Sequence, residues 1–256
     1  MNQILAFMKK EWMESIRTGK LLIMVIIFSL FGIMNPAMAL LTPWLFDMLS
    51  ESMAEQGLII TEMTVDALTS WGQYYKNISM MLIVLVVMFA GILVGELQKG
   101  TLINILTKGL PRWKVISSKS LVALLIWTIC YWLSYGITYG YNAYYWDNSV
   151  ASYLFFAAFS IYLLGIWLIS LIFLGSVLFS SSSGVLLFTG GVFAIVYFLS
   201  MVPKVAEFLP TKLLASYELL QGIVKPADYA KSIAILNVCS IVCYIITILR
   251  FNKKRL

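Results

Sequence analysis

The chain has 256 residues, of which 61% are hydrophobic and only 12% are charged, with a formal net charge of +6. Soluble domains are about half apolar and a quarter charged, so this composition excludes a soluble globular protein and indicates an integral membrane protein. The basic residues fall at the ends of apolar runs and form no single patch, which excludes a nucleic-acid-binding protein.

Residue usage also removes several catalytic classes. The chain has no histidine, which is the commonest general base and metal ligand. Its three cysteines all lie inside apolar runs, where they are expected to pack as small hydrophobic side chains: Cys130, Cys239 and Cys243. We therefore expect no disulfide framework, no metal site and no enzymatic activity in the chain itself.

The first expected element is an amphipathic helix in the N-terminal stretch, before the first long apolar run. Leu5, Met8, Trp12 and Ile16 recur at helical spacing, with charged residues on other faces. This pattern predicts a helix that lies on the membrane surface and contacts lipid. It is compatible both with a general membrane anchor and with a docking element for a partner.

Six apolar segments are long enough to cross a bilayer, which takes about twenty residues in a helix. None contains Asp, Glu, Lys or Arg, and the segments are residues 21–41, 78–95, 121–140, 153–179, 185–202 and 232–249. The first contains Asn35-Pro36, where the missing backbone donor of proline predicts a kink. The sequence thus predicts one all-α membrane domain that spans residues 1–256.

Two of the predicted outside loops have structure of their own. In loop 42–76, Thr42-Pro43 is expected to begin one short helix, and Thr61 to cap a second with Val65 and Leu68 on one face. In loop 203–230, a short helix is expected from Pro210 to Gly222, too short to span and apolar enough to re-enter the interface.

The distribution of charge predicts the orientation. Most of the 18 basic residues lie in the N-terminal stretch, in the loop between spans two and three, and in the C-terminal tail. The acidic residues cluster instead in the loop 42–76. Because Lys and Arg mark cytoplasmic loops, both termini are expected to be cytoplasmic.

Segment 96–119, between spans two and three, is charged and amphipathic. Leu102, Ile105, Leu106 and Leu110 share a helical face. Gly109 is expected to end that helix and Pro111 to open the next. The segment is interpreted as a part on which a cytoplasmic partner acts; the alternative is a loop whose basic residues only set topology.

This segment resembles the corresponding part of permease subunits of the ABC-2 transporter family. The matching positions include an acidic residue, Gly-Thr, an amphipathic helix and a basic-aromatic stretch: Glu96, Gly100, Thr101, Leu106, Arg112, Trp113 and Lys119. Six spans, cytoplasmic termini, an amphipathic N-terminal helix and a half-buried helix before span six extend the resemblance over the whole chain. The long acidic loop 42–76 departs from the plainest members.

The resemblance implies a permease in a bacterial plasma membrane, paired with itself or with a related permease, and with two cytoplasmic ATP-binding subunits. Those subunits would hold the ATP and Mg²⁺, since this chain has no phosphate-binding loop. Segment 96–119 would then be the coupling helix, with these contact residues: Glu96, Gly100, Thr101, Leu102, Leu106, Arg112, Trp113 and Lys114.

A polar-aromatic stripe runs along span three, at helical spacing: Thr128, Tyr131, Tyr135, Thr138 and Asn142. Its hydroxyls and rings are candidates to line a substrate path at a subunit interface. The alternative is that they bond to neighbouring helices or anchor the span at the membrane boundary.

The absence of charge within the spans argues against an ion-coupled carrier and a selective ion channel, and favours an amphipathic substrate. The leading hypothesis is therefore the permease of an ABC exporter for peptides, antimicrobials or lipid-like molecules. The alternative is a membrane immunity or sensor protein that binds a toxin peptide through loop 42–76 without transport.

Overall fold

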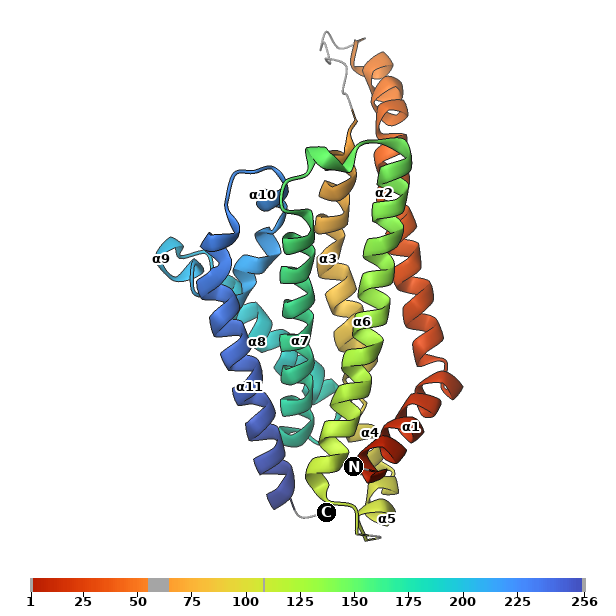
Figure 1. The fold of residues 1–256 in the computed structure, drawn as a ribbon, viewed down its shortest axis with the longest axis vertical. Helices are drawn as coiled ribbons and strands as arrows, with labels where there is room; N and C mark the ends of the chain where they lie inside the picture. Colours follow the sequence, from red (N-terminus) through yellow and green to blue (C-terminus); the bar gives the residue numbers. More distant parts are fainter. Residues whose placement is uncertain (1, 55–64, 108, 255–256) are drawn as a thin grey trace.

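A computed structural model describes residues 2–54, 65–107 and 109–254. Over these residues the chain is helical, without strands, and six helices are long and apolar enough to cross a membrane. They form one elongated bundle with both termini at the same end, shown in Figure 1. The predictions of an all-α fold and of six spans are confirmed.

Four of the six spanning helices are longer than the apolar runs that predicted them. The helices from span one to span six are α2 (Lys20–Ala54), α3 (Ala67–Phe89), α6 (Arg112–Tyr145), α7 (Leu154–Leu178), α8 (Ser182–Leu199) and α11 (Ala230–Lys253). The longer ones are α2, α3, α6 and α11. Helix α7 is the most buried of the six and α8 the least. Trp127 of α6 lies so close to Gly165 of α7 that an added Cβ would be 2.2 Å from its ring, so this glycine is needed where the two helices meet.

Helix α1 (Asn2–Arg17) lies at an angle across the end of the bundle that carries the termini (Figure 1), and packs against α6 and α2. The chain turns from α1 into α2 at Gly19, whose φ is +71°. The predicted N-terminal helix is thus present, but its buried face is formed by Phe7 and Glu11, one turn apart.

Helix α2 corrects the predicted start of a short helix at Thr42-Pro43. It continues through Pro36 and Pro43 to Ala54, so residues 42–54 continue the helix of the first span, whose apolar part ends at Phe46. Membrane helices tolerate proline when another group bonds the carbonyl that loses its donor. At Pro36 that carbonyl belongs to Gly32, and the hydroxyl of Thr138 on α6 donates to it over 2.9 Å.

Helix α3 begins earlier than predicted. The Asp66 carboxylate caps it by accepting a hydrogen bond from the Thr69 backbone N–H at 2.8 Å. Residues 67–76 therefore belong to the second span and not to a loop. The predicted cap at Thr61 lies outside the described residues.

The segment between spans two and three contains two short helices, α4 (Val94–Gln98) and α5 (Thr101–Thr107). Gly109, with φ of +87°, follows α5, and Pro111 is the N-cap of α6, as predicted. Helix α6 begins at Arg112, so residues 112–119 are the first turns of the third span and not a separate loop.

The loop before the last span folds against the other end of the bundle. The short helices are η1 (Asn148–Val150) between α6 and α7, and, in the last loop, α9 (Pro203–Ala206), η2 (Pro210–Ala215), α10 (Tyr217–Leu220) and η3 (Pro226–Tyr229). Gly222, with φ of +70°, follows α10 as predicted, but the single short helix expected from Pro210 to Gly222 is instead a 3₁₀ helix, η2, followed by the short α-helix α10. Leu213, Leu219 and Leu220 are buried against the bundle.

Candidate functional site

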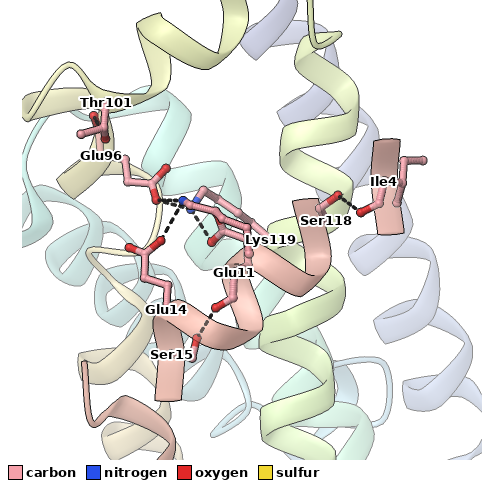
Figure 2. Close-up of polar contacts among 9 residues, drawn as sticks. Ile4, Glu11, Glu14, Ser15, Glu96, Thr101, Ser118 and Lys119 are labelled. Atoms are coloured by element: carbon pink, nitrogen blue, oxygen red, sulfur yellow. Dashed lines mark hydrogen bonds and ion pairs between the residues drawn. The ribbon is translucent and has the colours of Figure 1, made fainter. Parts of the chain in front are cut away.

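A cluster of charged side chains lies where α1, α4 and α6 meet, at the end of the bundle that carries the termini. We refer to these five residues as the charge cluster: Lys10, Glu11, Glu14, Glu96 and Lys119. Figure 2 shows Glu11 and Glu14 from α1, Glu96 from α4 and Lys119 from α6 converging on one point. Three elements far apart in sequence are thereby joined through charge.

Lys119 is the buried centre of the charge cluster. Its side chain is 1% exposed, and its Nζ lies 2.6 Å from Glu11 Oε2 and 3.0 Å from Glu96 Oε1. Glu11 is also buried, at 5%. Burial of charge is costly, and removal of one partner leaves the other charge uncompensated. The three side chains therefore hold α1, α4 and α6 together as a unit.

Lys10 covers the same carboxylates from the outer side. Its Nζ is 2.9 Å from Glu11, 2.7 Å from Glu14 and 3.0 Å from Glu96, and its side chain is 41% exposed. Burial alone would lower the pKa of Lys10, but hydrogen bonds to the three glutamates outweigh it and raise the pKa. Burial likewise raises the pKa of Glu14, yet its bond to Lys10 dominates and lowers that pKa.

The geometry of the charge cluster is more suitable for ion pairs that hold three helices together than for a metal site. Carboxylate oxygens of Glu11, Glu14 and Glu96 lie within 4.8 Å of one another, a spacing that a cation could bridge. The ammonium groups of Lys10 and Lys119 already occupy the space between them and supply the compensating charge. Cation binding would have to displace both lysines.

The predicted coupling residues have two kinds of environment. Glu96 belongs to the charge cluster, Gly100 takes a φ of +68° between α4 and α5, and Leu102 is fully buried. Thr101 is exposed at the start of α5, and Leu106 is half-buried against the core. Helix α5 lies at the tip of the bundle, beyond α4 (Figure 1).

The basic-aromatic part of the segment binds other elements of the chain. Arg112 Nη1 donates to the carbonyls of Phe251 at 3.1 Å and Asn252 at 3.2 Å, and also to that of Lys254, at the end of α11. Lys114 donates to Gln3 Oε1 at 2.7 Å, while Trp113 is 43% exposed. Arg112 thus bonds the last carbonyls of a helix, which gives it a stabilising position independent of any partner.

The predicted surface face of α1 is divided. Leu5 and Ile16 are exposed, at 58% and 51%, whereas Met8 and Trp12 are half-buried against the core. Leu5 and Ile16 therefore lie on the outer surface, and Met8 and Trp12 pack against the bundle.

The span-three stripe lies among helices of the same chain. Thr128 bonds Tyr162 at 2.8 Å and Tyr131 donates to the Ala158 carbonyl at 2.6 Å, both on α7. Thr138 donates to Gly32 of α2, and Asn142 accepts from Ser70 of α3 at 2.6 Å. The ring of Tyr135 contacts Trp71 of α3. These are the contacts expected from the packing alternative.

Sequence reasoning missed Glu11 and Lys119 as a buried pair. Glu11 follows Phe7 by one turn, so both share the face of α1 that packs on the bundle. Lys119 stands two residues before an apolar run, which is also typical of a topology signal. The sequence shows that Glu11 and Lys119 have opposite charges and lie near the ends of helices. Only the tertiary fold shows that they form an ion pair.

Comparison with known proteins agrees with this architecture. Residues 5–225 match the family described as "ABC-2 family transporter protein". The chain is also 25% identical over 268 residues to the "Uncharacterized transmembrane protein YxlG" of Bacillus subtilis (strain 168), covering 99% of this chain and 98% of that relative. The family match covers most of the chain, including α1, the charge cluster and five of the six spans. The chain is therefore a multi-pass membrane protein that belongs to the ABC-2 transporter family.

Proposed function

We propose that this chain is the permease of an ABC exporter, and that a cytoplasmic ATP-binding subunit drives it by pushing on α5. Membership of the family supports a membrane permease that works with an ATP-binding partner. ATP and Mg²⁺ would be held by that partner, since this chain has no phosphate-binding loop. The permease itself would make no chemical bond change.

The observation that carries the proposal is the position of Glu96. It lies on α4, directly before the exposed turn that leads into α5, while its carboxylate is 3.0 Å from both Lys119 of α6 and Lys10 of α1. A displacement of α5 would act on Glu96 and through it on two further helices. Charged groups held in one geometry transmit such a shift because separating them is costly.

The orientation and assembly follow from the same proposal. The excess of Lys and Arg at the end with the termini supports a cytoplasmic position for that end, in a bacterial plasma membrane. We propose a pair of permeases, identical or related, with two ATP-binding subunits. The substrate would be amphipathic, such as a peptide, an antimicrobial or a lipid-like molecule, because the six predicted apolar segments contain no charged residue.

The alternative of an immunity or sensor protein is less well supported than the permease, because most of the predicted loop 42–76 is helical. It depended on loop 42–76 as a toxin-binding region, but residues 42–54 and 67–76 belong to helices α2 and α3. The intervening residues 55–64 lie outside the described residues. Family membership favours transport.

The test compares two glutamates of the charge cluster. Glu96→Gln removes the charge that joins α4 to α6, whereas Glu14→Gln removes a half-exposed charge that bonds Lys10 alone in this cluster. We expect both variants to co-purify with the ATP-binding subunit. Glu96→Gln should lower permease-dependent ATPase stimulation at least about fivefold, the lower end of typical coupling between sites.

Glu14→Gln should stay within about twofold of the native chain, because exposed ion pairs contribute little. Measured ATPase rates of the complex, with and without permease, give the comparison. Equal stimulation in the native chain and in both variants would contradict the proposed coupling path.

A further inference from the structure

In the half of the bundle away from the termini, three helices meet along uncharged polar faces. We refer to this region as the polar seam: Gly32 and Asn35 of α2, Ser70, Tyr74 and Asn77 of α3, and Ser134, Thr138 and Asn142 of α6. On each helix, successive seam residues are three or four positions apart, so they share one face.

The polar seam is closed by hydrogen bonds between all three helices. Ser70 Oγ donates to Asn142 Oδ1 at 2.6 Å, and Asn77 Nδ2 donates to Asn35 Oδ1 at 2.7 Å. The Thr138 hydroxyl supplies the donor that Pro36 withholds from the Gly32 carbonyl. The helices are also close, since a Cβ on Gly32 would lie 2.9 Å from the Ser134 carbonyl oxygen.

Three polar atoms of the closed seam are buried without a hydrogen-bond partner among the described residues. They are Asn35 Nδ2, Asn142 Nδ2 and Ser134 Oγ, all on side chains that are 0% exposed. The Tyr74 hydroxyl is not one of them, because it pairs with the hydroxyl of Tyr131, which also donates to the Ala158 carbonyl. Native proteins rarely leave such groups unpaired, because each costs more than the hydrogen bond it fails to make.

Amide orientation does not remove the problem. The oxygen of Asn35 accepts from Asn77, so turning the Asn35 amide around would set two NH₂ groups against each other. Turning the Asn142 amide would only exchange which of its ends lacks a partner. The three unpartnered atoms can each donate a hydrogen, and turning the Asn142 amide would free the Ser70 hydroxyl as a donor in place of Asn142 Nδ2, so the seam has an excess of donors.

We propose that the polar seam opens during transport, and that its donors then bind carbonyl, ester or phosphate oxygens of the transported molecule. This inference rests on the proposed function. Acceptor oxygens match the unpartnered donors, and the seam residues carry no charge that would bind a small ion strongly. The unpaired buried groups raise the free energy of the closed state. The free-energy difference between the closed state and an open state is therefore smaller.

Helix α2 is the element we assign to the motion. It is the least buried of the three seam helices, and it follows α1 directly through the turn at Gly19. Since α1 carries Lys10, Glu11 and Glu14, movement of the charge cluster would reach α2 along the chain.

The experiment uses thiol labelling in open membrane sheets that contain the chain with its ATP-binding subunit. Ser134→Cys is introduced into a variant whose three native cysteines are replaced by alanine, and ATPase activity verifies the assembly. Labelling rates are measured without nucleotide, with ATP and with ADP–vanadate. The two reagents are methanethiosulfonates that bear either an ethylsulfonate or an ethyl-trimethylammonium group.

Each rate is divided by that of Ser152→Cys, an exposed position between α6 and α7. We expect labelling of Ser134→Cys to rise at least about tenfold in one nucleotide state, as a shift between two populated states allows. The sulfonate, which carries acceptor oxygens, should be favoured over the trimethylammonium. Ser176→Cys, equally buried but on α7 and hydrogen-bonded to the Ile172 carbonyl, should stay unreactive.

An unreactive Ser134→Cys in every nucleotide state, with ATPase activity retained, would overturn the inference and leave the ATP-driven permease intact. A preference for the cationic reagent, or equal labelling of Ser176→Cys, would overturn it as well. Rapid labelling of Ser134→Cys that is the same in all nucleotide states would support an opening seam and contradict the proposed coupling to ATP.

Discussion

The charge cluster and the polar seam occupy opposite halves of one bundle and are held together by different means. In the charge cluster, buried Lys119 contacts two carboxylates, and Lys10 covers them from outside. In the polar seam, uncharged groups are joined by three interhelical hydrogen bonds, and three donors have no partner among the described residues. Separating the paired charges of the charge cluster costs free energy, whereas the unpaired donors of the polar seam raise the free energy of its closed state. The proposed coupling uses this difference, because a rigid cluster at one end would pass a displacement on to a seam that opens at the other.

The largest expected effect is a difference in stability between substitutions of the two lysines of the charge cluster. Both lysines lie 3.0 Å from Glu96. Lys119→Met leaves buried Glu11 with only the half-exposed Lys10 as an ion-pair partner and should lower the free energy of unfolding by about 3–5 kcal/mol. Lys10→Met, at a half-exposed position, should cost about 0–1 kcal/mol. Thermal unfolding of both purified variants checks this, and equal losses would show that burial does not set the strength of the cluster.

A smaller effect is expected from two hydroxyls of the polar seam, one turn apart on α6 and both fully buried. Thr138→Val removes the donor to the Gly32 carbonyl and should lower the free energy of unfolding by about 1–3 kcal/mol, the cost of an unpaired buried group. Ser134→Ala removes a hydroxyl that has no partner among the described residues, so stability should be unchanged or higher. A comparable loss in Ser134→Ala would mean that this hydroxyl has a partner.

The smallest effect concerns two glycines. Gly32→Ala forces a Cβ to within 2.9 Å of the Ser134 carbonyl oxygen, whereas a Cβ on Gly136 would meet no atom within 4 Å. Overpacking costs about 1–3 kcal/mol, and alanine regains up to about 1 kcal/mol of helix propensity. Gly32→Ala should therefore lose about 1 kcal/mol and Gly136→Ala should gain about 0.5–1 kcal/mol. Melting temperatures of the two variants measure the difference; if they coincide, α2 and α6 are not closely packed at Gly32.

The spans, the short helices before span three and the interval from Pro210 to Gly222 could be predicted, because they depend on local apolar periodicity and on glycine and proline positions. The course of α2 could not. A single sequence shows that Pro36 removes a donor, but not that Thr138, about a hundred positions later, replaces it.

The candidate site was predictable only in part. Glu96 stood out as an acidic residue in a basic segment, and Leu102 as part of an apolar helical face. Arg112 resembled a docking residue, yet it bonds the end of α11. The roles of Glu11 and Lys119 depend on a contact over 108 positions, which no local pattern contains.

The central claim is that the ATP-binding subunit acts on α5, and photocrosslinking tests it most directly. A photoreactive amino acid is placed at exposed Thr101 on α5 or at exposed Ser152 at the opposite end of the bundle, with the ATP-binding subunit co-expressed. The account predicts an adduct with the ATP-binding subunit from position 101 and none from position 152. An adduct from position 152, with none from position 101, would contradict it.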